Sequence, residues 1–163
     1  MDNFPFYQVD SNTYVFEVAE GFQYVFSYSD ASHLISDHIE VKLNEISFDY
    51  IITEGLSKRE FINDRTVIRI RKTIIKIITK VIEDNQCSIV YICDSVDDLA
   101  KYRDGIFKGW YIDSESERDL ITRKFYLEEI DITHYVGIIA YNNSHFETLK
   151  DEMDNESLLS EKS

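Results

Sequence analysis

The sequence is poor in proline, glycine, cysteine and basic residues. One proline and five glycines among 163 residues exclude a collagen-like, linker-rich or low-complexity chain. Two cysteines exclude a disulfide scaffold and point to a reducing compartment. Seventeen basic residues against 31 acidic ones give a net charge of −14, which repels phosphate backbones at long range. This balance argues against broad nucleic-acid binding and against binding to anionic membranes.

The sequence also lacks the patterns of a secretion signal and of a membrane span. The first ten residues contain neither a basic region nor an apolar one, so we expect no signal peptide. The longest apolar-rich stretch, residues 66–82, is interrupted by charged side chains and is too polar to span a bilayer. Apolar residues make up 44% of the chain, which is enough for one core. We expect a soluble cytoplasmic protein, with a single domain over residues 1–153 and a flexible acidic tail over residues 154–163.

Two alternating segments, residues 13–18 and 22–28, predict a β-hairpin turned at Gly21, which lacks a Cβ and can adopt a positive φ. The second segment places four aromatic rings on one face: Phe22, Tyr24, Phe26 and Tyr28. Such a row can bind bases or sugars, but the interpretation that we favour is the core side of a sheet.

A third extended region covers residues 39–52. Its apolar alternation changes phase at Asn44 and Glu45. A slip of one residue moves every later side chain to the other face unless the backbone compensates. A β-bulge within one strand and a tight turn between two strands both explain the change.

The clearest element is a helix over residues 64–84. Its apolar side chains repeat on one face at helical spacing: Val67, Ile70, Ile74, Ile77, Ile78 and Val81. The opposite face carries a basic stripe: Arg65, Arg69, Lys72, Lys76 and Lys80. Asn63 or Asp64 can cap the start of this helix, and Asn85 can end it.

The second half of the chain alternates strands and helices. Residues 87–93 form an apolar run typical of a central strand buried on both faces. We expect a second helix over residues 96–107, followed by a polar connection over residues 112–123. Residues 125–132 and 135–141 then predict a hairpin that turns at Thr133 and His134. An amphipathic helix is expected from residue 144. The order β-β-β-α-β-α-β-β-α predicts an α/β fold, with a mixed, largely antiparallel sheet and helices on both faces.

Basic residues are concentrated on the long helix. Residues 58–80 hold eight of the 17 basic residues and only two acidic ones, Glu60 and Asp64. A solvated face that pairs with acids of the same chain explains this segregation. A docking surface for an acidic partner, a phosphate-bearing ligand or nucleic acid explains it too. Among these functional hypotheses we prefer an acidic protein partner, which includes a second copy of this chain.

Arg71 lies apart from the basic stripe, because its side chain projects toward the apolar face of the helix. A charge there has to reach water or pair with a carboxylate. Asp94, at the end of the central strand, is the first candidate partner, and Glu129 and Asp131 are others. A structural ion pair is the simpler interpretation, but a pair at the end of a sheet can also hold a ligand.

Histidines and cysteines predict no site of their own. The four histidines lack metal-ligand spacing, and we expect them on the surface: His33, His38, His134 and His145. Cys87 and Cys93 lie about 20 Å apart on one strand at ~3.3 Å per residue, so they cannot form a disulfide with each other, and we expect buried thiols. No residue is assigned to catalysis, and neither a cofactor nor a metal ion is expected.

The run Tyr91-Ile92-Cys93-Asp94 and the spaced residues Arg103, Phe107 and Trp110 resemble motifs of an uncharacterised family of small bacterial proteins with no assigned activity. The order of elements over about residues 13–142 also resembles that of GNAT-type N-acetyltransferases, with Gly109-Trp110 at the place of the family's Gly-Phe pair. That resemblance implies a glycine-containing loop for the acyl-CoA pyrophosphate at the start of the long helix, and an acid tyrosine. Residues 60–66 contain no glycine, and Gly105 stands at the tyrosine position, so the resemblance implies the fold without the usual catalysis.

These patterns leave three hypotheses for the function. The leading one is a non-catalytic binding or interaction module of a soluble bacterial protein, which binds a protein partner or itself through the basic stripe. The first alternative is a divergent N-acyltransferase-like or ligand-binding enzyme, with a site where Asp94, Trp110 and the helix start at residues 64–66 converge. The second alternative is an acidic mimic that binds a basic partner.

Overall fold

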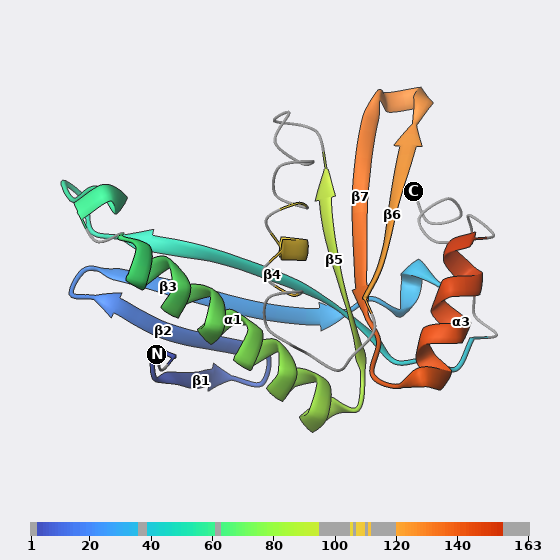
Figure 1. The fold of residues 1–163 in the computed structure, drawn as a ribbon, viewed down its shortest axis with the longest axis horizontal. Helices are drawn as coiled ribbons and strands as arrows, with labels where there is room; N and C mark the ends of the chain where they lie inside the picture. The colour runs from blue at the N-terminus through green and yellow to red at the C-terminus, as the bar shows by residue number, and fades with distance from the viewer. Residues whose placement is uncertain are drawn as a thin grey trace. The chain divides into compact units, whose positions relative to one another are not determined.

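The described residues of the computed structural model form a mixed sheet of seven strands in the order β1-β2-β3-β4-β5-β7-β6 (Figure 1). The structure describes residues 3–35, 39–60, 63–94, 105, 107–109, 111 and 120–154. The strands are β1 (Phe6–Asp10), β2 (Thr13–Ala19), β3 (Phe22–Asp30), β4 (Leu43–Ile52), β5 (Ser88–Asp94), β6 (Leu120–Leu127) and β7 (Ile132–Ile139). The α-helices are α1 (Asp64–Asn85) and α3 (Asn143–Asp154), and the short 3-10 helices are η1 (Ser32–Leu34), η2 (Lys58–Glu60) and η3 (Glu128–Ile130).

The strand pairing is mostly antiparallel. Strands β4 and β5 pair in parallel, whereas the pairs β1–β2, β2–β3, β5–β7 and β6–β7 are antiparallel. The predicted class, an α/β chain with a mixed, largely antiparallel sheet, is therefore confirmed.

The chain divides into two compact units. Unit 1 comprises Met1–Ser29 and Ile46–Lys80, and unit 2 comprises Asp30–Glu45 and Val81–Ser163. The single domain over residues 1–153 stays a prediction. Residues 155–163 of the predicted tail lie outside the described residues.

Unit 1 contains the predicted hairpin of β2 and β3. Gly21 in its turn has a φ of +83°, a conformation that glycine adopts without strain. A Cβ at this position would lie 2.8 Å from Oγ1 of Thr53 and 3.0 Å from Cδ1 of Leu56. The turn therefore requires glycine both for its backbone angle and for space.

Three of the four rings on the aromatic face of this hairpin belong to the core, as we favoured from the sequence, and the fourth, Tyr28, is half-buried. Phe16, Phe22 and Phe26 are fully buried, and the rings of Phe16 and Tyr24 stack with their centroids 5.3 Å apart. Burial raises the pKa of Tyr24 to about 12, and the neighbouring phenol of Tyr50 adds to this shift. The phenol therefore stays protonated at physiological pH, and the stacked rings leave no open face for a base or a sugar.

The predicted helix is confirmed as α1, Asp64–Asn85. Asn63 caps its start, because Oδ1 of Asn63 accepts a hydrogen bond from the backbone N–H of Thr66 at 3.0 Å. The apolar face is buried at the predicted positions Ile70, Ile74, Ile77, Ile78 and Val81. Val67 is 37% exposed, because burial of this face begins one turn later, at Ile70. No helix within the described ranges is long and apolar enough to cross a membrane.

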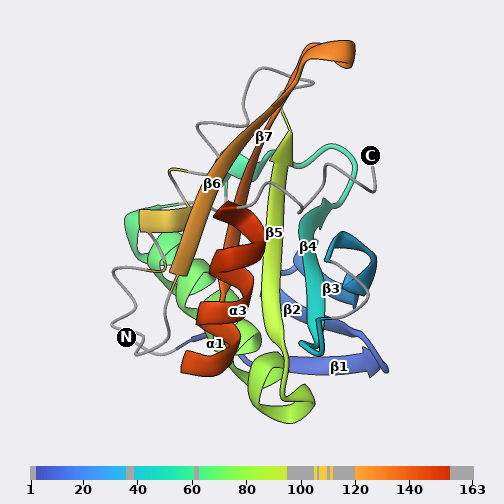
Figure 2. The ribbon, with the colours of Figure 1, turned by 90° about the vertical axis from the view of Figure 1, so that its right-hand side faces the viewer.

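Unit 2 has its core around β5 and β7. One buried cluster joins these strands to α3 and to the segment that contains η1: Ala31, Leu34, Ile35, Val41, Leu43, Val90, Ile121, Val136, Ile138, Leu149 and Met153. Figure 2 shows α3 alongside the strands of this unit. Both Ile89 and Val90, whose side chains point to opposite faces of β5, are fully buried, which confirms the predicted central strand.

Several predicted boundaries are wrong. The extended region predicted over residues 39–52 begins later, at Leu43, and forms the single strand β4, which is one of the two alternatives left open by the sequence. Strand β6 begins at Leu120, inside the predicted polar connection. The β6–β7 turn lies at residues 128–131 rather than at Thr133 and His134, because Asp131 adopts a φ of +52° while His134 pairs with Phe125. The sequence analysis also misses β1 entirely.

The prediction of helices on both faces of the sheet is not confirmed. Within its described residues, unit 1 contains the part of α1 up to Lys80 and no other α-helix, and this helix covers one face of the strands of that unit (Figure 1). The predicted helix over residues 96–107 lies largely outside the described residues. Gly105 and Phe107 are helical, as predicted, and the helical positions continue beyond the predicted end at residues 108, 109 and 111. The acetyltransferase-like order is not confirmed either.

We expect the substitution Gly137→Ala to destabilise the protein. A Cβ at position 137 would overlap the ring of Tyr91, which packs against Phe107 with the ring centroids 4.2 Å apart. Such overpacking lowers the free energy of unfolding by about 1–3 kcal/mol, which urea denaturation measures. The control is Gly105→Ala, at an exposed helical position with open space around it, which should be neutral or slightly stabilising. Equal stability of the two variants would contradict the close approach of Gly137 to Tyr91.

Candidate functional site

The basic stripe predicted on α1 lies on the surface of unit 1. Arg65, Lys72, Lys76 and Lys80 are exposed, and Arg69 is half-buried. Every exposed charged side chain of the helix from Arg65 to Lys80 is cationic. At a rise of ~1.5 Å per residue, the stripe follows about 22 Å of the helix.

The N-terminal segment of the chain contacts the middle of the stripe. The carbonyl oxygen of Asn3 accepts a hydrogen bond from Nη2 of Arg69 at 3.4 Å, and its Oδ1 accepts one from Nζ of Lys76 at 3.3 Å. The guanidinium of Arg69 lies 3.9 Å from the ring centroid of Phe4. The backbone N–H of Phe4 donates to Oγ1 of Thr73 at 2.8 Å. Two side chains of the stripe, Arg69 and Lys76, therefore already donate hydrogen bonds to oxygen atoms of the same chain.

The two units differ in formal charge. Unit 1 contains eight basic and eight acidic residues, so its formal net charge is zero. Unit 2 contains nine basic and 23 acidic residues and carries the whole net charge of −14. Six of the eight cations of unit 1 belong to α1. The stripe is therefore a local excess of positive charge in a unit that is neutral as a whole.

The other predicted site residues are less well defined. Arg71 is half-buried on α1, in unit 1. Asp94 ends β5 in unit 2, and its side chain lies outside the described residues, as does Trp110. The convergence of Asp94, Trp110 and the helix start at residues 64–66 stays a prediction.

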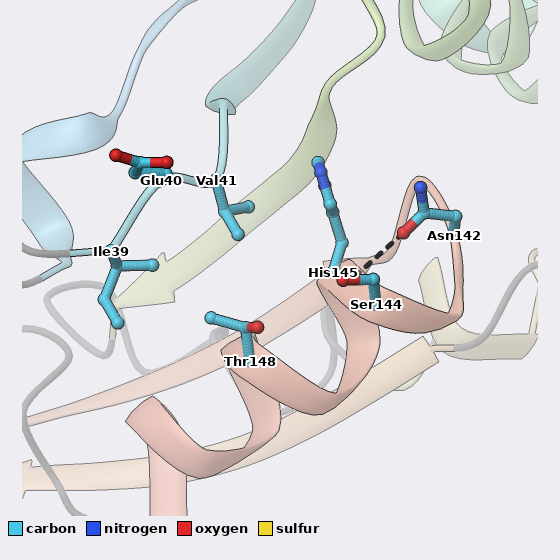
Figure 3. Close-up of a pocket in the computed structure, with 7 residues that line it drawn as sticks. All are labelled: Ile39, Glu40, Val41, Asn142, Ser144, His145 and Thr148. Carbon is cyan, nitrogen blue, oxygen red and sulfur yellow. Dashed lines mark hydrogen bonds between the residues drawn. The ribbon is translucent and has the colours of Figure 1, made fainter.

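A second candidate site, missed by the sequence analysis, is a cleft in unit 2. It has a volume of about 450 Å³ and is lined by Ile39, Glu40, Val41, Asn142, Ser144, His145 and Thr148. Figure 3 shows the segment before β4 on one side of the cleft and the first turns of α3 on the other. Asn142 caps α3, because its Oδ1 accepts a hydrogen bond from the backbone N–H of His145 at 2.9 Å. The lining includes one carboxylate, Glu40, and no lysine or arginine, so the cleft suits a neutral or cationic molecule better than a phosphate.

His145 has a defined orientation in this cleft. Its Nδ1 lies 2.9 Å from Oγ of Ser88, and the same Oγ accepts a hydrogen bond from the backbone N–H of Tyr141 at 2.9 Å. Because a hydroxyl oxygen has two acceptor lone pairs and one proton, Ser88 can donate to Nδ1 of a neutral imidazole or accept a hydrogen bond from it, and the tautomer decides which. Burial lowers the pKa of His145, which favours this neutral form.

The contact of Ser88 with His145 positions the ring and is not a nucleophile–base pair. Ser88 is fully buried, so its Oγ cannot reach a substrate. Cys87 is equally buried, and burial raises the pKa of its thiol, which keeps it protonated and unreactive. Cys93 is half-buried, so the expectation of a buried thiol is correct for Cys87 alone. Within the described part of the chain, no group of three His, Cys, Asp or Glu side chains is placed to hold a metal ion.

The expectation of surface histidines is wrong for two of the four. His145 is half-buried because it belongs to the α3 wall of the cleft. His134 is half-buried because it is a residue of β7 rather than of a turn, and its Nδ1 is buried without a hydrogen-bond partner. His33 is exposed, as expected, and His38 lies outside the described residues.

We expect the free energy of unfolding to decrease as the pH falls below about 6.5, the ordinary pKa of histidine. The lowered pKa of His145 means that, below this pH, the unfolded chain binds a proton that the folded chain does not bind. Urea denaturation at a series of pH values measures the effect, and His145→Gln should remove part of the slope. The matched control is His33→Gln at an exposed position, which should keep the slope. Identical pH profiles for wild type and His145→Gln would contradict this assignment.

Comparison with known proteins gives one match. No curated protein and no solved structure matches the chain. A family model described as "Family of unknown function (DUF6169)" matches residues 66–155, more than half of the chain. The matched range contains most of α1, with its basic stripe from Arg69 onward, and the α3 wall of the cleft. The predicted membership of an uncharacterised family is confirmed, and the chain belongs to the family of unknown function DUF6169.

Proposed function

We propose that this chain is a non-catalytic protein-binding module, which docks an acidic partner protein on the basic stripe of α1. One observation carries the proposal: every exposed charged side chain from Arg65 to Lys80 of α1 is cationic, in a chain with a net charge of −14. Like charges at i, i+4 spacing destabilise a helix, and solvated helix faces usually mix both signs. An acidic partner offsets this repulsion when it binds.

The contacts of the N-terminal segment support an acidic partner. Arg69 and Lys76 already donate hydrogen bonds to oxygen atoms of Asn3, which carries no charge. A carboxylate accepts such hydrogen bonds more strongly than an amide oxygen does, because both groups are then charged. An Asp or Glu side chain of a partner is therefore a better ligand for these two donors than Asn3.

Charge alone gives only weak binding. An exposed ion pair contributes about 0.2–1 kcal/mol, and salt screens it. Val67 lies in the first turn of α1 and is 37% exposed, so it offers an apolar contact near the start of the stripe. Lys58 lies 4.6 Å from the ring centroid of the exposed Tyr50, in the same unit. The partner segment that fits best is acidic with at least one apolar side chain.

We also propose that the module belongs to a bacterial cytoplasmic protein, with an acetyltransferase-like order of elements that lacks the acyl-CoA loop. The bacterial source and the order rest on the resemblances of residues 91–94 and of the segment 97–111. The low cysteine content, two residues in 163, supports a reducing compartment.

Charge reversal on the stripe tests the docking surface. We expect Lys72→Glu combined with Lys76→Glu to weaken binding of a fluorescein-labelled decaglutamate peptide to the full chain by about tenfold or more. Both side chains are exposed, so the substitutions should leave the fold intact. Fluorescence anisotropy titrations measure the affinity, and binding to the wild type should weaken as salt is added.

The control for this prediction reverses the same number of charges in unit 2. Lys42 and Lys150 are exposed there, and Lys42→Glu with Lys150→Glu makes the same change in net charge. We expect the control to bind decaglutamate nearly as well as the wild type does. An equal loss in both double variants would show that only net charge matters, and absence of binding to the wild type would also contradict the proposal.

Native mass spectra with added acetyl-CoA test the enzyme hypothesis. We expect no saturable adduct of CoA mass. The start of α1 at residues 63–66 has no glycine that would let backbone N–H groups approach a pyrophosphate, and no cation lines the cleft of unit 2. A saturable adduct would overturn the non-catalytic proposal and make Asp64 the first residue to substitute.

A further inference from the structure

Strand β1 has one edge that no other described strand pairs with. It is the first strand in the sheet order, and it pairs antiparallel with β2 along its other edge. The outer edge therefore presents backbone N–H and C=O groups to solvent, which is a template for another strand. We propose that β1 pairs antiparallel with β1 of a second copy of this chain, so that the two sheets join across a two-fold axis. This inference is independent of the basic stripe.

The side chains of β1 favour burial at this edge. Tyr7 is 57% exposed and Val9 is 53% exposed, and both are among the most exposed large apolar side chains of the described residues. The strand carries no lysine or arginine, the residues that most often protect an edge. An aromatic ring and a β-branched side chain are also the kind of pair that stabilises neighbouring strands.

The order of residues in β1 suits pairing with itself. When two copies align antiparallel with Gln8 opposite Gln8, Tyr7 of each copy faces Val9 of the other, and Phe6 faces Asp10. In this register, Tyr7 and Val9 of both copies are covered, because the two-fold axis repeats the contact. A slip by one residue on either side would place Tyr7 opposite Gln8 or Asp10 instead. A slip by two residues would place Tyr7 opposite Tyr7 or Val9 opposite Val9, so only the register centred on Gln8 pairs each aromatic ring with a β-branched side chain.

The distribution of charge also favours contact through unit 1. Unit 1 has a formal net charge of zero, whereas unit 2 carries the whole −14. Two copies repel each other overall, and at about 0.15 M ionic strength this repulsion is screened beyond a distance of about 8 Å. A contact between two neutral units is the one that net charge opposes least.

The length of β1 makes this a weak, reversible contact. The strand has five residues, follows Pro5, and has a register shift against β2 between Gln8 and Asp10. Proline and bulges limit how far a partner strand can extend. Such a short edge supports a small interface, below the size of a permanent dimer. We expect a monomer–dimer equilibrium rather than a filament.

Sedimentation velocity of the full chain tests the proposal, with concentrations up to about 0.5 mM because the interface is small. We expect the wild type to dimerise with concentration, and Y7K combined with V9K to weaken the dimer at least about tenfold. In that variant, the lysine at position 7 of each copy lies opposite the lysine at position 9 of the other copy, so like charges repel at both of these pairs. Y7K combined with V9E should restore the dimer, because an ammonium group then faces a carboxylate at both places.

The control is Ile51→Lys, which removes a side chain of β4 that is also 57% exposed and lies in the same unit. This variant should dimerise like the wild type, and all variants should keep the circular dichroism spectrum and urea midpoint of the wild type.

A dimer that survives Y7K with V9K overturns the proposal, and so does failure of Y7K with V9E to restore the dimer. A wild type that stays monomeric at every concentration overturns it too, and leaves the edge to an extended segment of another protein. The K72E and K76E double variant should dimerise normally, which separates this edge from the basic stripe.

Discussion

The packing of helix α1 in unit 1 fixes what that unit presents to solvent. The helix buries Ile70, Ile74 and Ile77, and at 3.6 residues per turn this turns the opposite face outward together with its lysines and arginines. Arg69 lies at the border of the two faces, with its guanidinium over the ring of Phe4. The ring of Phe4 in turn stacks on Phe16 in the aromatic core. The cationic surface is therefore a consequence of how the core is filled. A change that rotated the helix would move the basic stripe as well as the core.

The parts of the fold that follow from a strong local period could be predicted from the sequence. The helix α1 repeats its pattern over 22 residues, and the hairpin at Gly21 combines alternation with the one residue type that its turn allows. Strand β1 was missed because an edge strand is defined by its partner, and four of its five residues are exposed. The turn before β7 was missed because Glu128–Ile130 contains no glycine, proline or asparagine, and Asp131 takes the left-handed conformation without a signal in its neighbours.

The same distinction applies to the candidate sites. The basic stripe could be predicted, because charges of one sign at helical spacing are visible in the sequence and need only the helix to align them. The contact of Ser88 with His145 joins residues 57 positions apart, on β5 and α3. Neither residue has a local pattern that predicts the other, since only the packing of unit 2 brings them together. The lowered pKa of His145 comes from the same burial and could not be predicted from its neighbours in the sequence.

Unequal charge gives the two units different roles in protein contacts. The −14 of unit 2 produces a repulsion between copies that discourages indiscriminate association. In unit 1 the charges cancel, so short-range terms decide what binds there. The basic stripe selects by charge, because only an acidic segment gains from contact with it. In the proposed contact at the edge of β1, register matters, because only one alignment with a second copy places Tyr7 opposite Val9 at both ends. The two proposed contacts therefore differ in their chemical requirements: α1 requires negative charge in a partner, and β1 requires a strand that is complementary to it.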